Sequence, residues 1–195
     1  MRERQSLSAT TPLSHAGFTA VVDRHQHALY TFLRGMARHD EQARDLLQDT
    51  FHDAWRAARD GAPPFALGVA DEEMRRWLFA VAYRKVISLR RRQRLLRWDS
   101  LEDAPEALRI VALESSSFEN RLAEGEALSA ALAQLTPTDA ACLLLRIIQG
   151  FSAAEVGNIV GATPEVITKR LSRAKQRLRA AYLALETPRK EQNDL

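Results

Sequence analysis

Apolar residues in the first half of the chain recur every three or four positions, which is the spacing of an amphipathic helix. Three such rows run over residues 18–36, 47–58 and 74–89. Residues 60–64 lie between the second row and the third, and their glycine and two prolines are expected to end the second helix. No segment alternates apolar and polar residues for long enough to indicate a strand. The pattern therefore predicts an all-α first half.

The second half contains stronger signals for the ends of helices. Predicted caps stand at Thr136, Ser152 and Thr163, and the predicted helix ends are Gly150 and Gly161. In the helix after Thr136, the residues predicted to face inward are Leu143, Leu144, Ile147 and Ile148. In the last helix, the residues predicted to face inward are Ile167, Leu171, Ala174, Leu178 and Leu185. The whole chain is thus predicted to be all-α.

The composition changes abruptly between the two helical halves. Residues 96–125 are acidic, contain a proline and three consecutive serines, and are far longer than the usual connection of ~4–6 residues. This predicts a flexible acidic linker between two small helical domains. The predicted organisation is a disordered arm at 1–16, a first domain at 17–95, the linker at 96–125, a second domain at 126–185 and a tail at 186–195.

The overall composition excludes several classes of protein. Of the 195 residues, 46% are hydrophobic and 27% charged, which is typical of a chain that buries a core. No run approaches the ~18 apolar residues of a membrane span, and the polar N-terminus lacks the apolar part of a signal peptide. We therefore expect a cytoplasmic protein without membrane insertion. The single cysteine, Cys142, excludes an internal disulfide.

The net charge is only +3, but the charges are unevenly distributed. Residues 74–98 contain nine basic side chains and no acidic one, and residues 164–182 contain six basic side chains and one acidic one. Between them, residues 99–126 contain eight acidic and two basic side chains. One basic run on a helix is often a solvated face, but two runs with aromatic residues nearby indicate a nucleic acid partner.

Residues 152–182 have the layout of a helix-turn-helix: a short capped helix, a turn with Gly161 and a longer cationic helix. In this motif the second helix enters the major groove and its first turns contact base edges. The side chains placed for base contacts are Glu165, Thr168, Lys169, Arg170 and Arg173. Those placed for phosphate contacts are Lys175, Arg177 and Arg179. The alternative is an ordinary helical hairpin with a basic exposed face.

The second predicted helix carries an acidic stripe at successive i, i+4 steps. Its members are Glu41, Asp45, Asp49 and Asp53. A solvated face and a docking face for a basic partner both fit this pattern, whereas a metal site would need ligands from a second helix, and none is evident. His25 and His27 point to different sides of their helix and cannot share a zinc ion. We find no catalytic constellation and expect neither a metal nor another cofactor.

Three blocks resemble one family. The first block is residues 45–51 (DLLQDTF), followed by Ala54-Trp55-Arg56. The second is residues 76–79 (RWLF), at the start of the arginine-rich helix. The third begins at Gln149–Ser152 and continues through residues 169–175 (KRLSRAK) to Arg179. In this order and spacing they resemble bacterial RNA polymerase sigma factors of the sigma-70 family, in particular the small extracytoplasmic-function (ECF) group. The resemblance covers about residues 18–95 and 126–183.

The resemblance implies specific roles. Core polymerase would be bound through its clamp helices by Asp45, Gln48 and Asp49. The −10 promoter element would be bound by Arg75, Arg76, Trp77, Arg84, Lys85 and Ser88, with a flipped base held by the loop at 60–72. The −35 element would be bound by Thr168, Lys169, Arg170 and Arg173.

The implied function is transcription initiation without enzymatic activity. The implied partners are core RNA polymerase (the clamp helices of the largest subunit and the flap region), promoter DNA and an anti-sigma factor. Two other classes remain open: a stand-alone helix-turn-helix regulator with a helical sensing domain, and a helical metal-dependent enzyme that uses the acidic stripe. The DLLQD block at 45–49 distinguishes a sigma factor from a stand-alone regulator, because a stand-alone regulator has no need of this block.

Overall fold

The computed structural model describes residues 13–37, 39–62, 64–65, 70–96, 127–128 and 130–193. Over these ranges every regular element is a helix, as the sequence predicts. The first half contains α1 (His15–Met36), α2 (Asp40–Arg59) and α3 (Asp71–Leu96). The second half contains α5 (Pro137–Leu143), the π-helical turn η1 (Leu144–Ile148), α6 (Ala153–Val160) and α7 (Pro164–Asn193).

The helix ends follow the predicted capping residues. Thr136 accepts a hydrogen bond from the amide of Asp139, which fixes the start of α5. Ser152 and Glu155 form a capping box at the start of α6. Gly161 ends α6 with a φ of 76°, a left-handed conformation that favours glycine. These three caps confirm the predicted layout of the second half.

One prediction about the second half is wrong. Ile147 and Ile148 were expected to face inward, but they are 55% and 49% exposed. The reason is η1, because a turn with i→i+5 hydrogen bonds rotates the following residues away from the face set by a regular helix. Leu143, which precedes η1, and Leu144, the first residue of η1, are buried as predicted.

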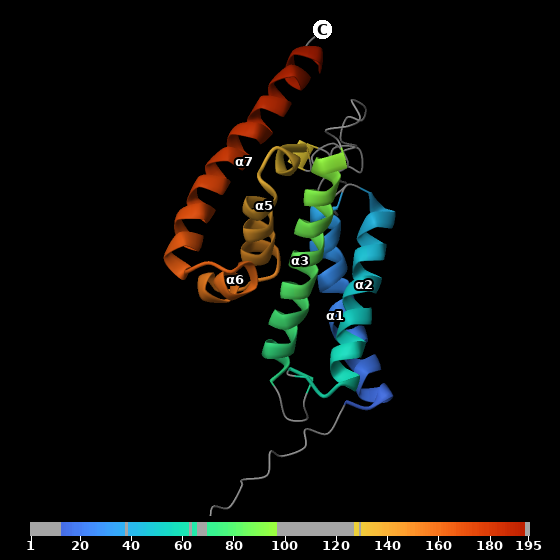
Figure 1. Cartoon of the computed structure of the whole chain (residues 1–195). Coiled ribbons are helices and arrows are strands. Elements are labelled where there is room, and N and C mark those ends of the chain that lie inside the picture. Colours follow the sequence, from blue (N-terminus) through green and yellow to red (C-terminus); the bar gives the residue numbers. More distant parts are fainter. Residues whose placement is uncertain are drawn as a thin grey trace, which may run out of the picture.

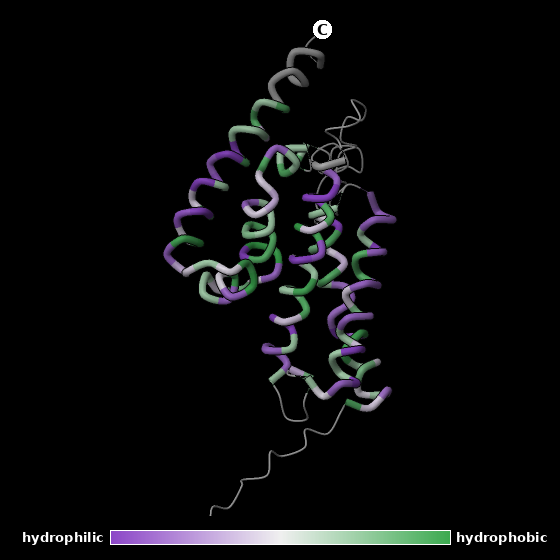
Figure 2. The backbone as a smooth tube through the Cα atoms, in the orientation of Figure 1, coloured by the Kyte–Doolittle hydropathy of each residue, from purple (hydrophilic) through white to green (hydrophobic). Residues whose placement is uncertain are grey.

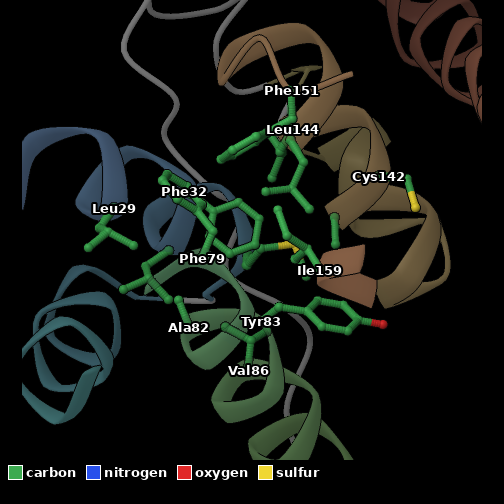
Figure 3. Close-up of a cluster of buried hydrophobic side chains, with 14 of the residues drawn as sticks. Leu29, Phe32, Phe79, Ala82, Tyr83, Val86, Cys142, Leu144, Phe151 and Ile159 are labelled. Carbon is green, nitrogen blue, oxygen red and sulfur yellow. The ribbon is translucent and has the colours of Figure 1, made fainter. Parts of the chain in front are cut away.

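The two halves pack against each other and share one hydrophobic core. In Figure 1, α3 lies between the α1–α2 pair and the second half, and α5 lies between α3 and α7. The ring of Phe79 in α3 lies 5.5 Å from that of Phe32 in α1 and 5.1 Å from that of Phe151, which precedes α6. Gly35 in α1 provides the space that Leu144 fills from the second half. Figure 3 shows these side chains in the shared core.

Two helices extend past the predicted boundaries of the domains, and other boundaries lie outside the described residues. The disordered arm was expected to reach residue 16, but Ser14 caps α1, which begins at His15. A tail was expected from residue 186, but α7 continues to Asn193. Residues 97–126, which include almost all of the expected linker, lie outside the described residues.

Candidate nucleic-acid interface and docking face

The side chains expected to bind polymerase form an exposed face on α2. Asp45, Gln48 and Asp49 are exposed, and so is Glu41 one turn before them. We call these four residues the acidic face. The opposite side of α2 is buried in the first half of the chain through Ala43, Leu46, Thr50 and Ala54. Because burial fixes the rotation of α2, the acidic face points away from the core.

Asp53 continues the predicted stripe in sequence but does not belong to the acidic face. Its carboxylate lies 2.7 Å from the Lys85 ammonium of α3. This ion pair joins the helix expected to bind polymerase to the helix expected to bind the −10 element.

A groove of about 440 Å³ lies between α2 and α3. Its lining includes four of the six residues expected at the −10 element, namely Trp77, Arg84, Lys85 and Ser88. Apolar side chains, including Leu46, Val81 and Leu89, line other parts of it. Trp77 is held by Phe65, whose ring lies edge-on at 5.0 Å. The groove therefore combines an oriented aromatic ring with cationic and hydroxyl groups.

The other two residues expected at the −10 element contact the second half of the chain. The Arg75 guanidinium lies 4.0 Å from the centre of the Phe151 ring and donates a hydrogen bond to the Gln149 carbonyl. The Arg76 guanidinium lies 3.6 Å from the Glu155 carboxylate. Hydrogen bonds from the Ser152 amide and hydroxyl, together with Arg76, lower the pKa of Glu155 and keep it ionised. Both guanidiniums thus contact the second half, although 37% of the Arg76 side chain stays exposed.

The start of α3 is anchored on α1 by a buried histidine. His25 is 2% exposed, and its Nε2 lies 3.2 Å from Oδ1 of Asp71, the first residue of α3. Arg24 also donates to this oxygen, at 3.0 Å. This anchor fixes the end of α3 that follows the loop expected to hold a flipped base.

This anchor predicts a pH dependence of stability. Burial lowers the pKa of His25 below 6.5, with smaller contributions from Arg24 and Arg75, although Asp71 opposes the shift. The unfolded chain therefore binds this proton more readily, so the contribution of neutral His25 is present above pH 6.5 and is lost as the pH falls through the folded-state pKa. Chemical denaturation between pH 5 and 8 should show this loss. His25→Gln should be less stable at pH 8 and should lack this part of the pH dependence; an identical slope in the variant would contradict the assignment.

The helix-turn-helix is formed as expected. In α7, Glu165, Thr168, Lys169, Arg173 and Lys175 are all exposed. A backbone hydrogen bond and the Thr163 hydroxyl lower the pKa of Glu165. The hydrophilic positions along the outer side of α7 are visible in Figure 2. This leaves the first turns of α7 free to meet another surface.

Arg170 and Arg177 are placed differently from the other cations of α7. The Arg170 Nη1 lies 2.9 Å from one carboxylate oxygen of Asp139, and the Arg177 Nη1 lies 3.3 Å from the other. Asp139 is 6% exposed. Nothing local in the sequence indicates that Asp139 has partners more than 30 residues away along the chain.

Other chemistry finds no support in the described part of the chain. Within those ranges no group of three or more potential ligands is positioned to hold a metal ion. Cys142 is buried, and this burial raises the pKa of its thiol to about 11. No helix of the described ranges is long and apolar enough to cross a membrane.

Comparison with known proteins identifies the class. Residues 125–178 match the family model of sigma-70, region 4. The chain is 29% identical over 170 residues to the RNA polymerase sigma factor CnrH of Cupriavidus metallidurans, covering 84% of this chain and 85% of the relative. It is 28% identical over 169 residues to the ECF RNA polymerase sigma factor SigE of Mycolicibacterium smegmatis, covering 84% of this chain and 60% of the relative. The chain as a whole is thus similar to ECF RNA polymerase sigma factors of the sigma-70 family.

Two solved structures of sigma factors have the same fold as this chain. RpoE of Bartonella quintana, solved in complex with the anti-sigma factor NepR, superposes with a TM-score of 0.67 at 24% identity, covering 84% of this chain and 95% of that one. CnrH, solved in complex with the cytosolic domain of CnrY, superposes with a TM-score of 0.60 at 24% identity, covering 88% of this chain and 90% of that one. The arrangement of helices in this chain is therefore shared with both.

Proposed function

We propose that this protein is an ECF sigma factor, which binds core RNA polymerase in the cytoplasm, directs it to promoters through −10 and −35 elements and assists melting, with no catalytic step of its own. The observation that carries the proposal is the combination in one chain of three surfaces. These are the acidic face of α2, the groove between α2 and α3, and the exposed first turns of α7. A stand-alone regulator would need only the last of them.

The groove suits single-stranded DNA of the −10 element. A fixed aromatic ring such as Trp77 provides a stacking platform for an unpaired base, and stacking of this kind contributes about 1–3 kcal/mol per base. Arg84 and Lys85 supply positive charge for the phosphates beside it. We propose that Asp53 holds Lys85 in place until DNA arrives.

We further propose that the two halves separate when the sigma factor engages a promoter. In the closed arrangement, Phe151 and the Gln149 carbonyl occupy the positions around Arg75 that a base and its acceptor oxygen would take. Glu155 occupies the position at Arg76 that a phosphate would take. The closed arrangement therefore competes with −10 DNA for the same two guanidiniums.

At the −35 element, we propose that Lys169 and Arg173 contact base edges and that Lys175 contacts phosphate. All three are exposed on α7, and arginine and lysine are the side chains that most often bind guanine in the major groove. Glu165 and Thr168 lie in the first turns and are positioned to set the preference at the neighbouring base pairs.

The regulator of this sigma factor is proposed to be an anti-sigma protein. The support is that RpoE and CnrH, which share its fold, were each solved with a bound protein that is named as an anti-sigma factor or as CnrY. Such a partner would act by holding the closed arrangement or by covering the acidic face.

The proposed function is tested by transcription with purified core polymerase. A DNA library randomised over the −35 and −10 elements is transcribed with and without the sigma factor, and the transcripts are sequenced. We expect transcripts that depend on the sigma factor and share both elements. A stand-alone regulator would bind duplex DNA alone and would neither associate with core polymerase nor support initiation, and that result would overturn the proposal.

A further inference from the structure

Asp139 connects α5 to two successive turns of the helix proposed to bind the −35 element. It lies in the first turn of α5, and each of its carboxylate oxygens accepts a hydrogen bond from a different arginine of α7. Arg170 and Arg177 are seven residues apart, which is close to two full helical turns, so both project from the same side of α7. One carboxylate therefore spans two turns of this helix.

The burial of this cluster limits what Arg170 can contact. Only 33% of the Arg170 side chain is exposed, and its Nε is buried with no hydrogen-bond partner among the described residues. The Asp139 side chain is 8% exposed, and a carboxylate so far removed from water requires cationic partners. Withdrawing Arg170 toward DNA would leave this carboxylate with Arg177 alone, at the longer distance of 3.3 Å.

The opposite side of α7 presents a different set of side chains. Ile167, Leu171 and Ala174 form the buried row of α7. At 100° per residue, the row facing directly away from them consists of Glu165, Lys169, Ser172 and Gln176, all of which are exposed. Arg173 lies beside this row, and its Nε is 3.4 Å from the Lys169 carbonyl. The rotation of α7 about its axis decides which of these side chains reaches the floor of the major groove.

We propose that Asp139 is a positioning residue for −35 recognition, which holds Arg170 and Arg177 on α5 and thereby presents the row Glu165–Lys169–Ser172–Gln176, with Arg173 beside it, to the bases. This inference rests on the proposed function, because it assumes that α7 enters the major groove. It removes Arg170 and Arg177 from the set of direct DNA contacts expected from the sequence. It adds Ser172 and Gln176, which that set did not contain.

Substitution of Asp139 should have different effects on DNA binding if it is a positioning residue than if it only stabilises the fold. Asp139→Asn removes the negative charge and frees two guanidiniums next to a helix that binds DNA. Each cation that gains a phosphate contact makes the dependence of log K on log salt steeper by about 0.9. Binding to unrelated DNA should therefore strengthen and become more salt-dependent, while binding to the selected −35 sequence weakens. A purely structural role would weaken both kinds of binding and leave the salt slope unchanged.

The experiment uses holoenzyme assembled from core polymerase and the full chain. A −35 duplex selected by the wild type from the randomised library and an unrelated duplex of equal length serve as probes, titrated from 50 to 300 mM salt. Asp139→Asn should lower the ratio of selected to unrelated affinity about tenfold and steepen the slope by one to two units. Asp139→Glu, which keeps the charge, should restore most of the ratio.

Arginine variants provide the matched comparison. Arg170→Ala should lower the ratio of selected to unrelated affinity without relaxing the preference at any single base pair, whereas Arg173→Ala should relax the preference at one base pair. If Asp139→Asn fails to fold, Arg177→Gln removes only the more exposed partner and should reproduce the lower ratio in weaker form.

Two results would overturn the proposed role of Asp139. One is that Arg170→Ala relaxes the preference at a single base pair. The other is that Asp139→Asn folds and keeps the wild-type affinity ratio and salt slope. Failure of the proposed function would look different, because the wild type itself would then neither join polymerase nor select a −35 sequence.

Discussion

Reversal of two charges on the acidic face, Asp45→Arg with Asp49→Arg, is expected to abolish binding to core polymerase while leaving the fold intact. Both carboxylates are exposed and belong to the face of α2 opposite its buried row. Exposed substitutions of this kind rarely change the free energy of unfolding by more than about 0.5 kcal/mol. Close charge pairs across protein interfaces couple by roughly 1.5–7 kcal/mol, so reversing two of them should weaken binding by at least about 100-fold. Co-purification with core polymerase and the melting temperature measure the two effects.

A second double variant distinguishes the effect of the acidic face on polymerase binding from the effect of net charge. Asp23→Arg with Asp60→Arg changes the net charge by the same amount at exposed carboxylates outside the acidic face. This control should bind polymerase nearly as well as the wild type. Equal loss in both variants would mean that polymerase senses only overall charge, and retained binding in the Asp45/Asp49 variant would remove α2 from the docking surface.

The parts of the fold that could be predicted from the sequence are those determined by neighbouring residues. The capping box of Ser152 and Glu155 acts over three residues, and the left-handed turn at Gly161 depends on the glycine itself. Helical spacing likewise predicted the buried row of α7, because a row of apolar residues at intervals of three and four fits only one face.

The parts that could not be predicted depend on residues far apart in the chain. The spacing of Ile147 and Ile148 fits a regular helix, so nothing local indicated the π-helical turn that exposes them. The contact of Arg75 with Phe151 joins residues that are 76 positions apart, and its existence required the packing of α3 against α6. Because the linker separates the halves in sequence, nothing local indicated that buried residues of both halves would pack in one core.

In the candidate site, too, some features follow from neighbouring residues and others depend on residues far apart in the chain. The sequence supplied the residue types of each surface, and the exposure of the acidic face and of the first turns of α7 agrees with those expectations. It gave Arg170 and Arg173 the same expected role, because both are arginines in the first turns of a cationic helix. Only the position of Asp139 on a different helix separates the two.

The second large effect is expected from Gly35→Leu, which places a bulky side chain in the contact between the halves. We call this substitution the wedge. A Cβ atom at this position of α1 would lie 2.7 Å from Cδ1 and 3.1 Å from Cδ2 of Leu144 in the other half. Leu144 could turn aside for a methyl group, but a leucine side chain adds three further carbons to a packed contact, and overpacking of this kind costs about 1–3 kcal/mol. Leucine also favours a helix over glycine by roughly 1 kcal/mol, so α1 itself should remain intact.

The wedge should therefore separate the halves without unfolding either of them. We expect a larger radius of gyration in small-angle scattering, unchanged helical content and, because Arg75 and Arg76 are uncovered, at least about tenfold tighter binding of the free chain to single-stranded DNA of a selected −10 sequence. Leu144→Ala in the same chain restores the missing space and should reverse both changes. A wedge variant that expands but binds this strand no better than the wild type would show that the closed arrangement does not compete with −10 DNA.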